Sequence, residues 1–143
     1  MTYTSTDKGY IIILTRGEKL IETLTSFCQK ENINLGVFNG IGACVDPELG
    51  YYNLEIKEYK WQIIEKEVEI VSLTGNVSLV DNSPFLHIHT VVSDDSFDTY
   101  GGHLKEAKVG ATCEIFLRIL DGKIVRNFDS EVGLKLLNCD QTF

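Results

Sequence analysis

The chain has 143 residues, of which 43% are hydrophobic and 24% are charged. This composition is typical of a folded globular protein, and the length predicts one domain over residues 1–143 with a sizeable core. The net charge of −8, from 13 basic and 21 acidic residues, disfavours a duplex-binding surface, which needs clustered lysines and arginines. The sequence has no apolar run of membrane-spanning length and no signal-peptide pattern, so we expect a cytoplasmic protein without a membrane partner.

The first elements predicted are a strand and a helix. Residues 10–14 are rich in isoleucine and predict a buried strand. The next four residues, 15–18, match a capping box, with Thr15 as N-cap and Glu18 three positions later. Apolar side chains then recur at helical spacing, so we predict one amphipathic helix over about residues 17–31. This is the strongest helix signal in the chain.

The remainder predicts strands. Gly40-Ile41-Gly42-Ala43 is interpreted as a tight turn at a strand end, and Asp121-Gly122 as a two-residue hairpin turn. A polar connection at residues 55–57 separates two of the strands. One helix packed on a mostly antiparallel or mixed sheet defines the α+β class. The predicted strands cover residues 35–41, 49–54, 58–65, 67–79, 85–92, 109–120, 123–128 and 134–137.

The four cysteines are widely spaced and form no Cys-x-x-Cys pair. We expect them to be buried small hydrophobic residues, with a disulfide or a thiolate metal site as the alternative. They are Cys28, Cys44, Cys113 and Cys139.

All three histidines of the chain fall in one short stretch, at His87, His89 and His103. His-x-His on a strand places both rings on one face, because side chains alternate with period two. The glycine pair before His103 allows close backbone approach. Three imidazoles predict a site for a divalent metal with an open position, with zinc as the first expectation and nickel, cobalt, copper or iron as alternatives. The other interpretation is three structural histidines.

Of three further groups of residues, only the carboxylates are candidates for the surroundings of this site. Carboxylates are expected to orient metal-bound imidazoles, and Asp94, Asp95 and Glu114 are placed to do so, although Glu114 also fits an exposed strand position. A metal-bound water could act as a nucleophile, but no residue is predicted to be catalytic. A group of aromatic residues fits core or subunit-interface packing. Three basic residues are expected to form either a small basic patch beside a hairpin or a solvated strand face. The aromatic residues are Tyr51, Tyr52, Tyr59, Trp61 and Phe85, and the basic ones are Arg118, Lys123 and Arg126.

Five motifs in this order and spacing resemble the plants-and-prokaryotes-conserved (PPC) domain family over about residues 9–137. The resemblance implies an α+β fold, a homotrimer and a metal site at the three histidines. Plant members join the domain to separate AT-hook segments that bind DNA, and prokaryotic members are stand-alone domains described as candidate DNA-binding proteins. This chain has no Arg-Gly-Arg-Pro hook. The motifs are Arg16-Gly17-Glu18, Gly40-Ile41-Gly42-Ala43, Ser72-Leu73-Thr74-Gly75-Asn76, Phe85-Leu86-His87-Ile88-His89 and Gly101-Gly102-His103-Leu104.

These observations lead to three functional hypotheses. The first is a homotrimer of the PPC type with a three-histidine metal site near a subunit interface, which binds or acts on a small molecule. The second is a DNA-binding or transcription-regulatory module, in which the domain supplies oligomerisation and protein contacts. In one form of this hypothesis, a trimer gathers Arg118, Lys123 and Arg126 from several subunits into a basic patch. The third is a purely structural oligomer. The acidic charge and the missing hook favour the first hypothesis, with DNA contact weak or indirect.

Overall fold

The computed structural model describes residues 1–139, which form nine strands and one α-helix. In chain order these are β1 Thr2–Thr6, β2 Gly9–Thr15, α1 Leu20–Lys30, β3 Gly36–Asn53, β4 Glu58–Ile63, β5 Glu67–Val80, β6 Ser83–Ser93, β7 Thr99–Ile119, β8 Val125–Asp129 and β9 Leu134–Asn138. None of the described residues lies in a helix that is long and apolar enough to cross a membrane.

The nine strands form one sheet, in which the path β1-β2-β7-β3-β5-β8-β9 is extended by β4 on β3 and by β6 between β5 and β7. Every strand pair is antiparallel except β5 with β8, which meet through one parallel bridge. The long strand β7 pairs with β6 through its first residues and with β2 through its last, and with β3 along most of its length. The α+β class with a mostly antiparallel sheet is therefore confirmed.

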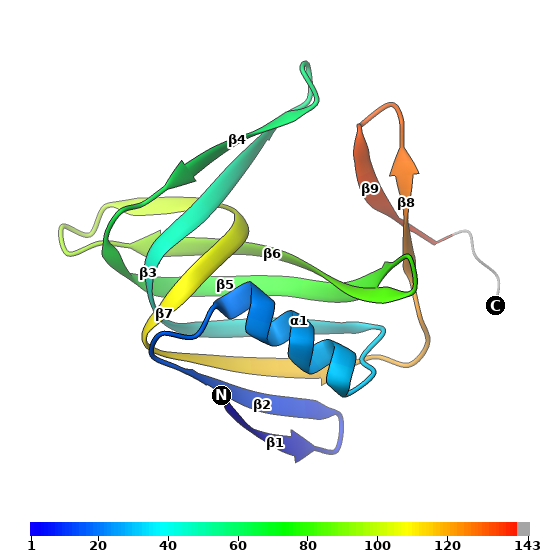
Figure 1. The fold of residues 1–143 in the computed structure, drawn as a ribbon, viewed down its shortest axis with the longest axis horizontal. Helices are drawn as coiled ribbons and strands as arrows, with labels where there is room; N and C mark the ends of the chain where they lie inside the picture. The colour runs from blue at the N-terminus through cyan, green and yellow to red at the C-terminus, as the bar shows by residue number, and fades with distance from the viewer. Residues whose placement is uncertain (140–143) are drawn as a thin grey trace.

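Helix α1 lies across one face of the sheet (Figure 1), where it contacts β6 and β7. It buries Leu20, Leu24, Phe27 and Cys28, whose spacing of three and four residues defines a single apolar face. The sheet contributes inward side chains from alternating positions of its strands, since successive residues point to opposite faces. The most deeply buried of these are Ile12, Leu14, Leu73, Val77, Ile88, Val92, Val109, Cys113 and Ile115.

The helix begins at Leu20, three residues later than predicted, and Thr15 is not its cap. Glu18 does accept a hydrogen bond from the Thr15 backbone N–H, so the predicted pair forms a turn. The residues after Thr15 continue the pairing with β7, because Gly17 donates to the Val109 carbonyl and Val109 donates to that of Glu18. The first turn of the helix is capped instead by Glu106 of β7, which accepts hydrogen bonds from the Ile21 and Glu22 N–H groups.

Two turn predictions were wrong. Gly40 to Gly42 lies inside β3 as a register shift in its pairing with β5, so residues 36–53 form one continuous bent strand. The chain after Asp121-Gly122 does not fold back along β7: β8 crosses to β5 and bonds through Leu79 and Val125, and then pairs with β9. Strand β1 was not predicted, because its five residues are all exposed and carry no apolar alternation.

Two hairpins of the sheet project from its main body. They are the β3–β4 arm, residues 48–63, and the β8–β9 arm, residues 125–138, and Figure 1 shows both directed toward the top of the view. Tyr52 donates its hydroxyl proton to the Val132 carbonyl at 2.7 Å, and Lys57 donates to the Ser130 carbonyl at 2.8 Å. The two arms are therefore joined through the turn of the β8–β9 arm.

The face of the sheet opposite α1 carries exposed apolar side chains. Residues paired across strands share a face, and successive pairs run from His89 to Thr74, then Asn39, Phe116 and Ile11. Phe116 is 54% exposed, and Ile41 on the same face is 58% exposed. The two strand histidines therefore lie on the same face as an apolar surface.

The cysteine prediction holds for three residues of the four. Cys28, Cys44 and Cys113 are buried and unpaired, and burial raises the pKa of each thiol to about 12. Cys139 is exposed, because it follows the last strand and has no sheet neighbour to cover it.

Candidate metal site

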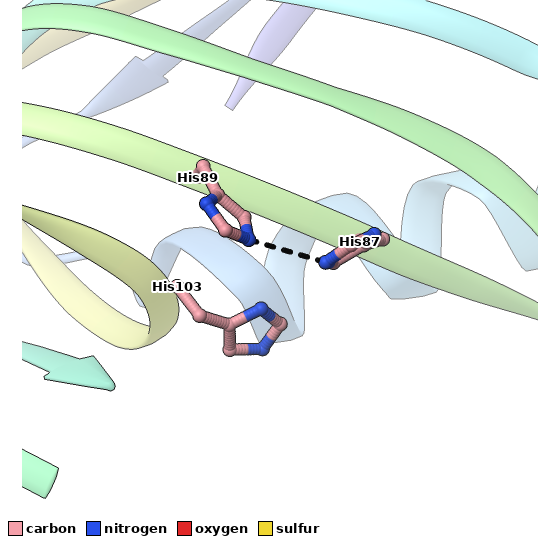
Figure 2. A group of neighbouring side chains, drawn as sticks. All are labelled: His87, His89 and His103. Atoms are coloured by element: carbon pink, nitrogen blue, oxygen red, sulfur yellow. Dashed lines mark hydrogen bonds between the residues drawn. The ribbon is translucent and has the colours of Figure 1, made fainter. Parts of the chain in front are cut away.

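The structure brings the three predicted histidines together. His89 of β6 lies directly opposite His103 of β7 in the strand pairing, and His87 is two residues earlier on the same face of β6. Pairing between β6 and β7 goes no further than His103, where β7 separates from β6. One nitrogen from each ring lies within 4.8 Å of the others, and Figure 2 shows the three imidazoles gathered around a common point.

The spacing of these nitrogens suits a tetrahedral metal. The Nε2 atoms of His87 and His89 are 3.2 Å apart. Two ligands at about 2.0–2.1 Å from a tetrahedral zinc ion would be separated by about 3.3 Å. His103 Nδ1 is buried and has no hydrogen-bond partner among the described residues. A buried polar atom without a partner is destabilising, and a metal ion at the centre would give this nitrogen one.

The local electrostatics keep imidazole lone pairs available. Burial, followed by the charges of Arg126 and the other two histidines, lowers the pKa of His87 to about 4. Burial also lowers the pKa of His103, with smaller contributions from His89 and Arg126. Both rings are therefore neutral near pH 7, which is the state that binds metal ions.

Two glycines allow the strands to meet at this point. A Cβ on Gly102 would lie 2.8 Å from the Gly50 carbonyl oxygen, so the approach of β7 to β3 requires the glycine before His103. A Cβ on Gly50 would lie 2.4 Å from Trp61 Cζ3 and 2.9 Å from Tyr59 Cδ1. The missing side chain at Gly50 therefore leaves room for two aromatic rings next to His103.

Those rings form an aromatic wall on one side of the site. Tyr59 and Trp61 of β4 stack with ring centroids 4.5 Å apart. The His103 ring lies 5.3 Å from Tyr59 and 6.0 Å from Trp61. The sequence indicated core or interface packing for these residues. Their alternation on β4 was the one signal that they share a face.

Arg126 forms the other side of the site, and the sequence analysis missed it. Its Nη2 lies 3.3 Å from His87 Nδ1 and donates to Asn76 Oδ1 at 3.0 Å. Its Nε donates to Ser78 Oγ at 2.8 Å, and its Nη1 to the Lys135 carbonyl at 3.2 Å. Arg126 is only 9% exposed. The expected surface patch with Arg118 and Lys123 is therefore wrong for this residue, because β8 turns inward to β5 rather than returning along β7.

The predicted supporting carboxylates are not at the site. Asp94 is buried, but it accepts hydrogen bonds from Lys66, Ser96, Asp98 and Tyr100. Asp95 borders a separate hollow near Val68, and Glu114 faces Ile13 and Ile41 toward the far end of β7. In the described part of the chain, no aspartate or glutamate is hydrogen-bonded to any of the three histidines.

The model of the Plants and Prokaryotes Conserved (PCC) domain matches residues 1–121, which include the three histidines. The chain belongs to this family. The match ends before Arg126, so the arginine beside His87 lies outside it. No curated protein matches the chain.

Solved structures of the same fold cover nearly the whole chain. A Pyrococcus horikoshii plant- and prokaryote-conserved protein is 35% identical, with a TM-score of 0.86 and coverage of 99% of this chain and 97% of that one. A structure called the metal-containing protein of Archaeoglobus fulgidus is also 35% identical, with a TM-score of 0.86 and coverage of 96% and 99%. A Bacteroides thetaiotaomicron structure called a "putative DNA binding protein" is 26% identical, with a TM-score of 0.95 and coverage of 98% of both chains.

Proposed function

We propose that this protein holds one divalent metal ion, zinc in the first instance, at His87, His89 and His103, and binds or acts on a small molecule there. The observation that carries the proposal is the convergence of three imidazole nitrogens within 4.8 Å, one of them buried without a partner. The name of the Archaeoglobus fulgidus protein adds support from a structure of the same fold.

The residues present fit a metal that keeps an open position. Three neutral imidazoles supply three ligands. Among the described residues, no carboxylate or thiolate joins this group as a fourth ligand. A zinc ion held in this way acts as a Lewis acid and lowers the pKa of a bound water to about 7. The aromatic rings of Tyr59 and Trp61 and the side chain of Arg126 would then limit which molecules reach the open position.

Metal analysis of the purified protein tests this proposal. We expect about one divalent ion per chain, and we expect His87→Ala and His103→Ala to lose it, since two imidazoles rarely hold zinc against buffer. Thr74→Ala is the matched control, because Thr74 lies opposite His89 on the same face but offers no ligand. Stoichiometric metal in a chain without the three histidines would contradict the proposal.

We also propose that the chain is a homotrimer whose interface covers the apolar face around the histidines. Exposed apolar surface of this kind marks interaction sites, and Val37, Ile41 and Phe116 lie on the face that carries His87 and His89. In such a trimer the metal site would lie near a neighbouring subunit. The number of subunits rests on the family resemblance.

A DNA-associated regulatory role is the second candidate function. It is favoured by similar structures from Bacteroides thetaiotaomicron and Ralstonia eutropha, both named as DNA-binding candidates. The charge of −8 and the burial of Arg126 oppose it, since a trimer can gather fewer basic side chains than the sequence indicated.

A further inference from the structure

Arg126 is a buried cation without an anionic partner. Its four contacts within hydrogen-bond distance are to a hydroxyl, a backbone carbonyl, a side-chain amide and an imidazole, all of them neutral. None of the ion pairs among the described residues includes it. Arginines this well buried are normally paired with a carboxylate, because a lone charge is poorly solvated away from water.

The same imbalance extends over the whole histidine cluster. A divalent ion on three neutral imidazoles would add two positive charges beside the one on Arg126. Among the described residues, no aspartate or glutamate is hydrogen-bonded to or ion-paired with the three histidines or Arg126. A metal-loaded site would therefore carry about three positive charges with no negative side chain to balance them.

We propose that this site binds a small molecule bearing a carboxylate group, which meets the open metal position and is held by the guanidinium of Arg126. This inference rests on the proposed metal site and names the substrate class for it. A guanidinium presents parallel N–H groups that match the two oxygens of a carboxylate.

The position of one proton links metal loading to the availability of Arg126. Nη2 of Arg126 can donate to His87 Nδ1 only if that nitrogen carries a lone pair, so the proton of neutral His87 then lies on Nε2. A metal on Nε2 takes that place and leaves the proton on Nδ1. Nη2 then loses an acceptor and has an N–H group free for a carboxylate oxygen.

The walls of the site restrict the rest of the ligand. Tyr59 and Trp61 stand beside His103, and Phe85 lies beneath Arg126, whose guanidinium carbon is 5.3 Å from the ring centroid. The arms that carry Trp61 and Arg126 are joined by Tyr52 and Val132. These contacts leave the site bounded on both sides, which favours a small carboxylate over a macromolecule.

Acetate titrated into Co²⁺-loaded protein tests the inference, because the visible absorption of Co²⁺ changes when a ligand joins the metal. We expect saturable binding of acetate to wild type, about tenfold weaker binding to Arg126→Met, and an intermediate affinity for Arg126→Lys, which keeps the charge but not the fork. Arg118→Met is the matched control, since this substitution removes the same charge from a position on β7 away from the histidines. We expect it to behave as wild type.

Metal content is measured on every sample, so that two kinds of failure are separated. A wild-type protein that takes up no metal overturns the proposed function, and this inference with it. Full metal loading with no response to acetate, or with equal affinity in wild type and Arg126→Met, overturns this inference alone. If Arg126→Met does not fold, wild-type affinity in Arg126→Lys overturns it, as does a response to inorganic phosphate but not to acetate.

Discussion

Asp94 is a buried carboxylate that stabilises the loop between β6 and β7. Its side chain has no exposed surface, and it accepts hydrogen bonds from Lys66, from the Tyr100 hydroxyl and from the N–H groups of Ser96 and Asp98. The hydrogen bond from Lys66 is the main cause that holds the pKa of Asp94 below its ordinary value of 3.8. The carboxylate thus fixes the loop that leads from β6 into β7. Strand β7 begins at Thr99, four residues before His103.

This gives a prediction for acid stability. A lowered pKa in the folded state means that the unfolded chain binds a proton more readily, so the contribution of Asp94 is present above pH 3.8 and is lost as pH falls below that value. We expect the free energy of unfolding of wild type to fall more steeply than that of Asp94→Asn as pH decreases from about 4 to about 2, because the folded pKa lies below 3.8. Urea unfolding across this range checks it, and equal slopes would contradict it.

At the scale of residues, the sequence predicted the clustering of the three histidines better than it predicted their surroundings. Strand alternation placed His87 and His89 on one face, and the glycine pair indicated the close approach that positions His103. Arg126 carried no such local signal. Its place beside His87 depends on the single bridge from Leu79 to Val125, a contact across 46 residues that no periodicity reveals.

Helix α1 illustrates how a tertiary contact replaces a local cap. The Glu106 carboxylate accepts hydrogen bonds from Ile21 N at 2.9 Å and Glu22 N at 3.2 Å, and so satisfies two of the free donors in the first turn. A negative charge at this end also interacts favourably with the helix dipole. The side chain of Lys19, which precedes the helix, makes no cap of its own.

We therefore expect Glu106→Ala to lower the free energy of unfolding by about 1 kcal/mol, the usual cost of losing a helix cap. Thr15→Ala serves as the comparison, because Thr15 was the cap predicted from sequence and its exposed hydroxyl donates to Glu18 rather than to the helix. Its effect should stay within about 0.5 kcal/mol. Chemical denaturation of both variants measures the difference, and a larger loss for Thr15→Ala would refute the assignment.

Among the elements, strands with clear apolar alternation were predicted, and errors arose where the chain changes partner. The polar connection at residues 55–57 does join β3 to β4, because both strands remain neighbours there. Asp121-Gly122 has equally good turn chemistry, but β3 already occupies the edge of β7 at Arg118 and Ile119, and β2 the other edge at Arg118. A returning strand had no free edge to pair with, and β8 joined β5.

At the scale of the molecule, the apolar face around the histidines predicts self-association. We expect wild type to sediment as a trimer of the 16.1 kDa chain at micromolar concentration, and Ile41→Asp to shift it to smaller species, since the change puts a charge on the covered face. Phe97→Asp is the control, because Phe97 is 87% exposed on the loop between β6 and β7. A stable wild-type monomer would contradict the trimer.

The distribution of charge favours the small-molecule hypothesis over the DNA hypothesis. Five lysines form ion pairs in the described structure, namely Lys19 with Glu22, Lys30 with Glu31, Lys66 with Asp94, Lys105 with Glu48 and Lys135 with Asp81. Arg126 is directed inward to His87. Phosphate binding depends on the counterions that accessible cations release, so few such contacts are available to a duplex.

We accordingly predict that duplex DNA binds at physiological salt with a Kd of roughly 10⁻⁴ M or weaker, within the nonspecific range. Fluorescence anisotropy of a labelled duplex, titrated at several salt concentrations, measures both the affinity and its salt dependence. Arg118→Ala should leave this weak binding unchanged, because one exposed arginine makes at most one phosphate contact. Submicromolar binding that falls steeply with salt and is weakened by Arg118→Ala would instead support the DNA-binding function, with Arg118 gathered from several subunits.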